Sequence, residues 1–287
     1  MGLTHARSSL ESTTTLAHCT SLLAAIVALG LCAQAQAQSE VDKLRTGLRL
    51  NLGIGVVMGD LDFRSNRLGD TTEQIVVAAD LGQIPSASLG LSAWINENAG
   101  FETSYQLGAL GEVAVPLNVL LGQDDGTLAL THHRFSGAFL YRWFTGPRLT
   151  SWAFGLRAGF QLHSIIPSPH TPTIVLSTTY FGPELGATTL APLTESLGLE
   201  LDASLVLPFN VREFPDNSGV PDNPLGARLG LAPFFRLSDS LILKARYDLR
   251  LFNVAFKDTG TRGLGGVPGG VSNDLFHSAM LLIELIP

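Results

Sequence analysis

Residues 196–207, with the sequence SLGLELDASLVL, alternate between polar and apolar side chains. One parity carries Leu197, Leu199, Leu201, Ala203, Leu205 and Leu207, and the other carries Ser196, Gly198, Glu200, Asp202 and Ser204. Successive side chains of a β-strand point to opposite faces, so this period of two predicts a strand with one apolar and one polar face. A tilted strand of about 9–11 residues crosses a bilayer, and this stretch is long enough to do so.

The same alternation recurs in ten segments, at residues 45–59, 86–95, 101–109, 132–144, 150–163, 180–190, 197–207, 228–237, 241–254 and 275–286. The segment 180–190 is the weakest of them, because Pro183 interrupts it and proline in a strand favours an edge or a bulge. We therefore predict an all-β protein, a transmembrane antiparallel up-and-down β-barrel of about ten strands.

The connectors between these segments are of two kinds. Short turns lie near Asn96, Thr145, Ala191 and Asp239, and they alternate with longer connectors at residues 60–85, 110–130, 164–179, 208–227 and 255–274. In transmembrane barrels of bacteria the periplasmic turns are short, the extracellular loops are long, and the strand count is even. We expect the short turns, and both chain ends, on the periplasmic side.

Residues 1–37 are predicted to be a signal peptide, which leaves residues 38–287 as one barrel domain. Arg7 precedes the apolar run 22–33, and Ala35-Gln36-Ala37 has the small-x-small pattern of a cleavage site. The apolar run is shorter than the roughly 20 residues of a spanning helix, so no transmembrane helix is predicted.

Both cysteines, Cys19 and Cys32, lie in this predicted signal peptide. Lipoprotein processing at Cys32 is the alternative, and it is disfavoured because Leu29-Gly30-Leu31 places a bulky leucine where a small residue is expected. A mature chain without a thiol excludes disulfides, cysteine-bound metals and cysteine nucleophiles. The formal net charge of −7 argues against nucleic acid as a partner.

Charged residues in the middle of the strands decide which face meets lipid. A charge at the bilayer midplane costs about 2–4 kcal/mol, so the polar parity is predicted to face the barrel interior. The predicted lumen-lining residues are Arg49, Arg134, Arg142, Arg157, Glu200, Asp202, Arg228, Lys244, Arg246, Asp248 and Arg250. The same parity holds Arg45, Arg236, Glu102, Glu184 and Glu284. Glycines such as Gly198 and Gly230 share this face, and small residues beside long ones favour a filled lumen.

Aromatic residues flank one of the short turns. Tyr141, Trp143 and Trp152 lie on either side of the turn near Thr145. Tyrosine and tryptophan are enriched at both membrane interfaces, so we predict that these three form part of an interfacial aromatic belt. Ordinary outward packing is the alternative.

With its signal peptide and its hairpin pattern over the whole mature length, the chain resembles the bacterial outer-membrane β-barrel superfamily. Ten strands is the size of the omptin proteases and slightly larger than the OmpA-like barrels. The resemblance implies an outer-membrane location, contact with lipid and lipopolysaccharide, and insertion by the barrel-assembly machinery. Leu281, Ile283 and Leu285 fit the family's last strand, whereas Pro287 stands where these barrels usually end in an aromatic residue.

The predicted lumen is net basic in an acidic chain, which leaves two readings of function. If the charges pair across the interior, they close the barrel, and its role is structural or is the binding of a surface ligand or partner. If water fills the interior, the protein is a narrow or gated channel that prefers anions and carries a small anionic solute. Ten strands lie nearer to filled eight-stranded barrels than to open porins, so we favour the salt-bridged lumen. No cofactor is predicted.

A third reading is an omptin-like surface protease. It would need acidic pairs and a His–Asp pair at the extracellular rim, and the candidates are Asp60 with Asp62, Asp124 with Asp125, and His132 with His133. The characteristic omptin spacings are absent, and a phospholipase-like site at His277 and Ser278 lacks a matching motif. The acidic pairs offer oxygen ligands for Ca²⁺ but no complete ligand set. We predict no catalytic residues, no metal site, and a protein that is not an enzyme.

Overall fold

The structure is a computed structural model that describes residues 44–67, 70–115, 126–168, 175–207, 210–262 and 267–287. The predicted signal peptide and the pair Asp124–Asp125 lie outside the described residues. The strands are β1 (Gly47–Arg67), β2 (Asp70–Asp80), β3 (Ile84–Trp94), β4 (Ala99–Val115), β5 (Gly126–Phe144), β6 (Ala153–Ser168), β7 (Ser177–Pro192), β8 (Leu197–Val206), β9 (Asn210–Phe214), β10 (Val220–Ser238), β11 (Leu241–Lys257) and β12 (Gly270–Leu285).

Ten of these strands close into a barrel. β1 pairs with β3 on one side and with β12 on the other, and the order around the ring is β1-β3-β4-β5-β6-β7-β8-β10-β11-β12 with antiparallel neighbours. β2 and β9 lie outside the ring and pair with β1 and β7. The prediction of an up-and-down antiparallel barrel of ten strands is confirmed. Within the described part of the chain, no helix is long and apolar enough to span a bilayer.

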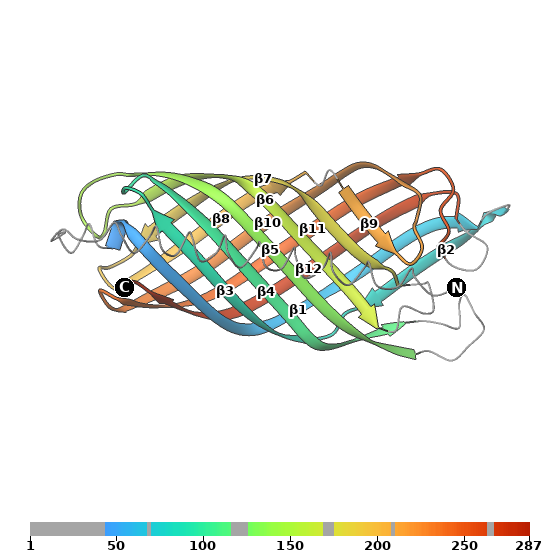
Figure 1. Ribbon diagram of the computed structural model, residues 1–287, viewed down its shortest axis with the longest axis horizontal. Helices are drawn as coiled ribbons and strands as arrows, with labels where there is room; N and C mark the ends of the chain where they lie inside the picture. The colour runs from blue at the N-terminus through green and yellow to red at the C-terminus, as the bar shows by residue number, and fades with distance from the viewer. Residues whose placement is uncertain (1–43, 68–69, 116–125, 169–174, 208–209, 263–266) are drawn as a thin grey trace, which may run out of the picture.

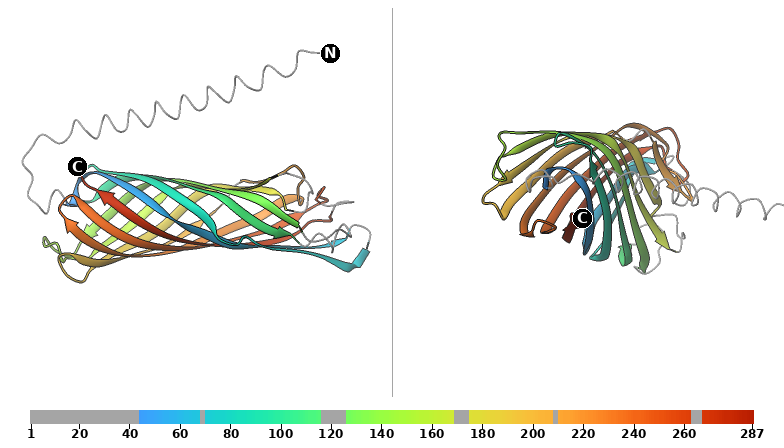
Figure 2. Two further views of the ribbon diagram at one scale, coloured as in Figure 1. Left: turned by 90° about the horizontal axis from the view of Figure 1, so that it is seen from below. Right: turned by 60° about the vertical axis from the view of Figure 1, so that its left-hand side comes forward.

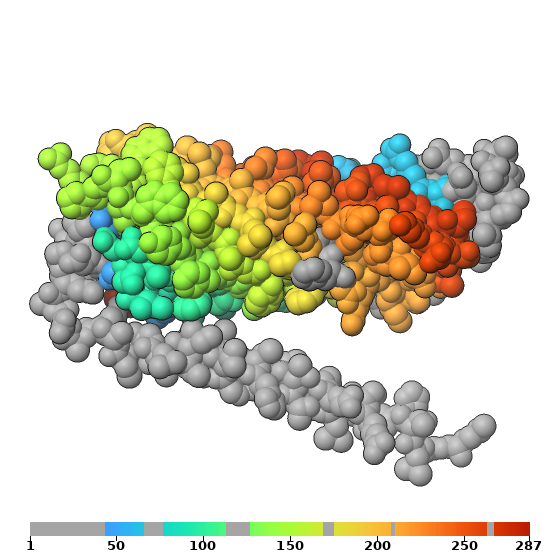
Figure 3. All heavy atoms as spheres, turned by 90° about the horizontal axis from the view of Figure 1, so that it is seen from above, coloured from blue at the N-terminus to red at the C-terminus, as the bar shows by residue number. Residues whose placement is uncertain are grey.

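The strands run obliquely along a long, narrow barrel (Figure 1). The start of β1 and the C-terminus lie at the same end, and β2 extends from the opposite end (Figure 2). We call the first the turn end, because it carries the connections at residues 95–98, 145–152, 193–196 and 239–240, and the other the loop end. On the face shown in Figure 3, the side chains of neighbouring strands form a continuous wall.

At the loop end, more of the chain is paired than the sequence predicted. Residues 60–85 were expected to be a long loop, but β1 continues to Arg67 and β2 returns along it. The connector 208–227 likewise contains β9 and the first residues of β10. These extensions continue the alternation, with Phe63 and Ala79 buried, so pairing satisfies the backbone and buries apolar side chains.

The outer surface changes character along the strands. On β1, Ile54 faces outward with 69% of its surface exposed, and on β12 Leu281 is 66% exposed. Farther toward the loop end, the outward positions of β1 become Asp60 and Arg64, while Phe63 between them is buried. Apolar residues therefore face outward near the turn end and inward near the loop end.

This inversion marks where the surroundings change from lipid to water. An apolar outer wall matches hydrocarbon, and a polar wall around an apolar interior matches water. β11 shows the same change, since Leu243 and Leu251 are exposed, whereas Asn253 and Lys257 lie beyond them. The loop end thus extends beyond the membrane-spanning part as a water-exposed structure with its own apolar interior.

The two faces of β8 allow a direct test of this assignment. Leu201 is exposed on the outer wall, and its neighbour Glu200 lies on the inner face, 3.1 Å from Lys244. Leu201→Arg should reduce folding into lipid vesicles, because it places a charge in hydrocarbon at a cost of about 2–4 kcal/mol. Glu200→Gln should fold. The folded fraction is measured from the mobility difference between heated and unheated samples in gel electrophoresis, and equal effects of the two changes would contradict the assignment.

Candidate functional site: the barrel interior

The inward side chains of β11 show how the interior is divided. From the turn end to the loop end they are Ile242, Lys244, Arg246, Asp248, Arg250, Phe252, Val254 and Phe256. The first half is mainly charged and the second half is apolar. Since every barrel strand alternates in the same way, the interior consists of a charged zone near the turn end and an apolar zone near the loop end.

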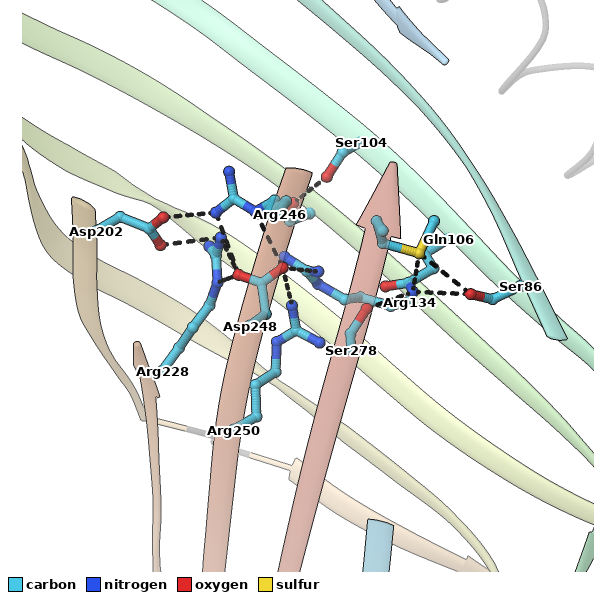
Figure 4. Close-up of polar contacts among 12 residues, drawn as sticks. Ser86, Ser104, Gln106, Arg134, Asp202, Arg228, Arg246, Asp248, Arg250 and Ser278 are labelled. Carbon is cyan, nitrogen blue, oxygen red and sulfur yellow. Dashed lines mark hydrogen bonds and ion pairs between the residues drawn. The ribbon is translucent and has the colours of Figure 1, made fainter. Parts of the chain in front are cut away.

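Asp248 is the centre of the charged zone, and four arginines surround it (Figure 4). One carboxylate oxygen lies 3.0 Å from Nη2 of Arg228, and the other lies 3.0 Å from Nε of Arg246. Arg250 and Arg134 approach the second oxygen to 3.5 and 3.8 Å. All five side chains come from the inner faces of β5, β10 and β11, which places one anion among several cations.

A second carboxylate shares two of these arginines. Asp202 on β8 lies 2.6 Å from Nη2 of Arg246 and 3.0 Å from Nη2 of Arg228. Gly230 separates the two carboxylates, since it pairs with Asp202 on one side and Asp248 on the other. A Cβ at Gly230 would clash with the Asp202 carboxylate, so only glycine leaves the room that this arrangement uses.

The ion pairs continue in both directions from this centre. Arg228 reaches Glu184, which also contacts Arg157, and Arg157 lies 2.8 Å from Glu102. Toward the turn end, Arg246 contacts Glu200, and Lys244 joins Glu200 to Glu284, which pairs with Arg49. The result is one continuous network with members on β1, β4, β5, β6, β7, β8, β10, β11 and β12. Burial of so many charges is tolerated only because they are paired.

At the turn end, two arginines are held mainly by backbone carbonyls and aromatic rings. Arg45 donates to the carbonyls of Gly146 and Arg148, and its guanidinium carbon lies 3.8 Å from the Phe144 ring centroid. Arg142 donates to the carbonyls of Glu97 and Arg45. Its guanidinium carbon lies 3.4 Å from the centroid of the Trp94 ring and 5.0 Å from that of Phe144.

A layer of histidines separates the charged zone from the apolar zone. The His132 and His163 rings lie 4.6 Å apart, and His163 contacts Phe252 and Phe276 at 5.1 and 4.4 Å between centroids. Both histidines are buried, and among the described residues no hydrogen-bond partner is found for their ring nitrogens. His132 was predicted near the extracellular rim. The structure turns the His132 ring into the barrel interior, whereas the next residue, His133, faces outward, so the two histidines do not form a pair.

The apolar zone fills the barrel at the loop end. Its buried residues include Val57, Phe63, Leu81, Ile84, Leu130, Ile165, Tyr180, Phe252, Val254 and Phe276. Tyr180 stacks on Phe252, with ring centroids 4.3 Å apart, and its hydroxyl donates to Asp274. Contacts among such rings add to the stability gained by their burial.

A buried ion pair covers this apolar zone outside the membrane-spanning segments. Arg262, on the connector after β11, lies 3.6 Å from Glu213 of β9 and donates to the Ser218 hydroxyl. Its guanidinium carbon also lies 4.0 Å from the Phe63 ring centroid. Burial raises the pKa of Glu213 and lowers the pKa of Arg262, although each group opposes the shift of the other. The contact joins two connectors across the loop end.

A cavity of about 240 Å³ lies within the charged zone. Ten of the eleven predicted lumen-lining residues border it, and Arg250 is buried beside it in the network. Its wall carries nine Arg and Lys side chains but five Asp and Glu side chains. The apolar residues Leu44, Leu149, Leu190, Phe234 and Ile242 form its wall at the turn end.

The other predicted candidates lie on the outer surface. Tyr141, Trp143 and Trp152 are 48%, 44% and 47% exposed. His133 and His277 are also outside the barrel, where their Nδ1 atoms lie 2.8 and 2.5 Å from the hydroxyls of Tyr105 and Tyr247.

The rim candidates show no assembled catalytic or metal site among the described residues. Asp62 pairs with Arg64 on the surface, 2.7 Å apart, and Asp60 is exposed. In the described part of the chain, no group of three or more His, Cys, Asp or Glu side chains is arranged to hold a metal ion.

The apolar zone is the feature of the interior that was not predicted from the sequence. The sequence does contain a sign of this zone. Phe252 and Val254 share the parity of Arg246 and Arg250, and Leu130 shares that of Arg134. An apolar residue on the inner parity contradicts the rule for a water-filled lumen. Strand periodicity alone does not show that several such residues, far apart in sequence, meet at one level of the barrel.

No protein family and no curated protein matches the sequence. The outer-membrane protease OmpT of Escherichia coli is similar in fold, with a TM-score of 0.52 and 9% identity, covering 83% of this chain and 96% of that one. OprG of Pseudomonas aeruginosa gives a TM-score of 0.39 with 9% identity, covering 86% of this chain and 100% of that one. An outer-membrane channel from Pseudomonas putida F1 gives 0.37 with 11% identity, covering 86% and 99%.

At these identities, the likeness concerns the fold alone. OmpT, whose TM-score is the highest of the three, is an outer-membrane protease, and this chain shares its barrel fold. The outer wall of this chain is apolar near the turn end, as a wall in contact with hydrocarbon has to be. The chain has the fold of the bacterial outer-membrane β-barrels.

The centre of the ion-pair network is expected to stabilise the barrel strongly. Asp248→Asn removes the carboxylate that faces four arginines and should lower the free energy of unfolding by about 3–5 kcal/mol, because it leaves buried cations unpaired. Asp222→Asn is the matched control, since Asp222 pairs with the exposed Lys257, and should have little effect. Denaturant unfolding in lipid vesicles, followed by tryptophan fluorescence, gives both values. Equal losses would show that the network does not carry this stability.

Proposed function

We propose that the protein is a closed outer-membrane barrel with a structural role or a role in binding a surface ligand or partner, and that it is not an enzyme. The observation that carries the proposal is the filling of the interior by two successive zones. An ion or solute that enters from the turn end meets the Asp248 network and then the apolar zone around Phe252. Both would have to be displaced for passage.

The apolar zone is the stronger of the two barriers. Ion pairs can exchange partners with a passing anion, whereas buried Phe252, Phe276 and Leu130 offer an ion no polar contact. The Arg262–Glu213 pair adds a further contact across the loop end. In this proposal, lipid and lipopolysaccharide surround the wall, the barrel-assembly machinery inserts it, and the loop end binds the partner.

A narrow or gated channel for a small anionic solute is the second candidate. The nine cationic and five acidic side chains around the cavity favour it, because a charged lining selects ions of the opposite sign. In this case the apolar zone would be the gate. The omptin-like protease has weaker support, because the likeness to OmpT is one of fold and no assembled catalytic site is found among the described rim residues.

Single-channel recording separates the first two candidates. The refolded mature protein, inserted in a planar bilayer with a salt gradient, should give no discrete conductance steps, because the apolar zone blocks the interior. Folding is verified on the same sample by gel mobility. Regular anion-selective steps would overturn the closed barrel and support the channel. Arg246→Glu combined with Arg250→Glu should then shift the preference toward cations.

We also propose that the turn end faces the periplasm, with Tyr141, Trp143 and Trp152 at that interface. Their exposure beside the turn 145–152 supports the assignment. The barrel has three tryptophans, and Trp94 lies against the cavity. Lipids brominated near the headgroup should quench the fluorescence of single-tryptophan variants that keep Trp143 or Trp152 more than that of a variant that keeps Trp94. Stronger quenching by lipids brominated deep in the chain would place the first two away from the interface.

A further inference from the structure

The cavity at the turn end has the features of a binding site rather than of unused space between side chains. Its volume of about 240 Å³ is far above the roughly 10–15 Å³ that one water needs. Its wall combines cations from several strands with the apolar residues Leu44, Leu149 and Ile242. A cavity with an apolar wall and a few convergent polar groups is the usual form of a small-molecule site.

The surplus of positive charge is concentrated beside this cavity at Arg142. Among the described residues, Arg142 has no carboxylate within ion-pair distance, and its donors reach the backbone carbonyls of Glu97 and Arg45. Trp94 holds its guanidinium flat by stacking at 3.4 Å. An arginine fixed in this way keeps its charge available while its position is set by the protein.

A second arginine lies next to it. Arg45 and Arg142 place their guanidinium carbons 3.8 and 5.0 Å from the same Phe144 ring, so two like charges are held close together. Glu97 pairs with Arg45 but is half-exposed, and Glu284 is shared between Arg49 and Lys244. Repulsion between like charges is strong where water is scarce, and a bound anion would relieve it.

The unpartnered nitrogen of Arg49 supports the same conclusion. Its Nε is buried and has no hydrogen-bond partner among the described residues, although its terminal nitrogens reach Glu284 and the Leu44 carbonyl. A buried donor without a partner costs free energy that a ligand or water would restore. Arg49 and Arg142 both border the cavity.

We propose that this cavity binds a small organic carboxylate, with its carboxylate at Arg142 and Arg49 and its apolar part against Leu44, Leu149 and Ile242. The guanidinium group matches a carboxylate in shape and charge. The apolar side of the cavity distinguishes such a ligand from an inorganic anion. The site lies in the charged zone, on the turn-end side of the apolar zone, so a ligand that enters from the turn end would not have to cross the apolar zone. The proposal holds whether or not the barrel conducts.

Trp94 gives a direct measurement, because it stacks on the arginine that would bind the carboxylate. In a variant with Trp143→Phe and Trp152→Phe, Trp94 is the remaining tryptophan. Titration with benzoate should produce a saturable change in its fluorescence. Benzamide has the same shape without the charge and should bind at least about tenfold more weakly. Calorimetry on the unsubstituted barrel repeats the comparison without the tryptophan changes.

Two arginine variants locate the site. Arg142→Gln should weaken benzoate binding at least about tenfold. Arg148→Gln removes the same charge from an exposed position at the turn end that does not border the cavity, and it should leave binding unchanged. The proposal is overturned if benzoate and benzamide bind equally, if phosphate binds and benzoate does not, or if Arg142→Gln binds like the parent. If Arg142→Gln fails to fold, the comparison of benzoate with benzamide decides alone.

Discussion

The pairing of β1 with β12 is the constraint on which the rest of this structure depends. Inside a bilayer, a backbone group without a hydrogen bond has no water to replace it, so a sheet in that environment must close on itself. Closure fixes which face of each strand meets lipid, and it encloses an interior that the chain must fill. The ion pairs and the apolar contacts of the interior form because the inner faces of ten strands surround one closed space.

The interior is filled in two ways along the barrel axis, by paired charges near the turn end and by apolar side chains near the loop end. Near the turn end, Asp202 and Asp248 pair with arginines from neighbouring strands, and Gly230 between them gives these side chains room. Near the loop end, the inner faces carry Phe63, Phe252 and Phe276, and the outer faces become polar. A charged interior fits a wall that is surrounded by hydrocarbon, because charged side chains must then face inward. An apolar interior fits a wall that is surrounded by water, because apolar side chains must then face inward.

Two buried histidines form the boundary between the charged zone and the apolar zone. His132 and His163 stand between paired charges and aromatic rings, without a hydrogen-bond partner among the described residues. On their turn-end side lies a cavity whose lining carries more cationic than acidic side chains, and on their loop-end side lies a packed apolar core. The apolar zone thus separates the charged zone and its cavity from the loop end.

Alternation alone determined the fold, because a period of two with charges on one parity has one arrangement in a membrane. Residues such as Leu201 and Glu200 could be assigned to the wall and the interior from sequence. The charge partners could not, since the contact of Asp248 on β11 with Arg134 on β5 depends on barrel closure and on register between distant strands. The same holds for the apolar zone, because Phe63 and Phe256 are far apart in sequence and become neighbours, 6.3 Å between ring centroids, only because barrel closure pairs both β1 and β11 with β12. Periodicity is a local property of the chain, whereas the level at which two inner faces meet is set by how the strands tilt and pair around the ring.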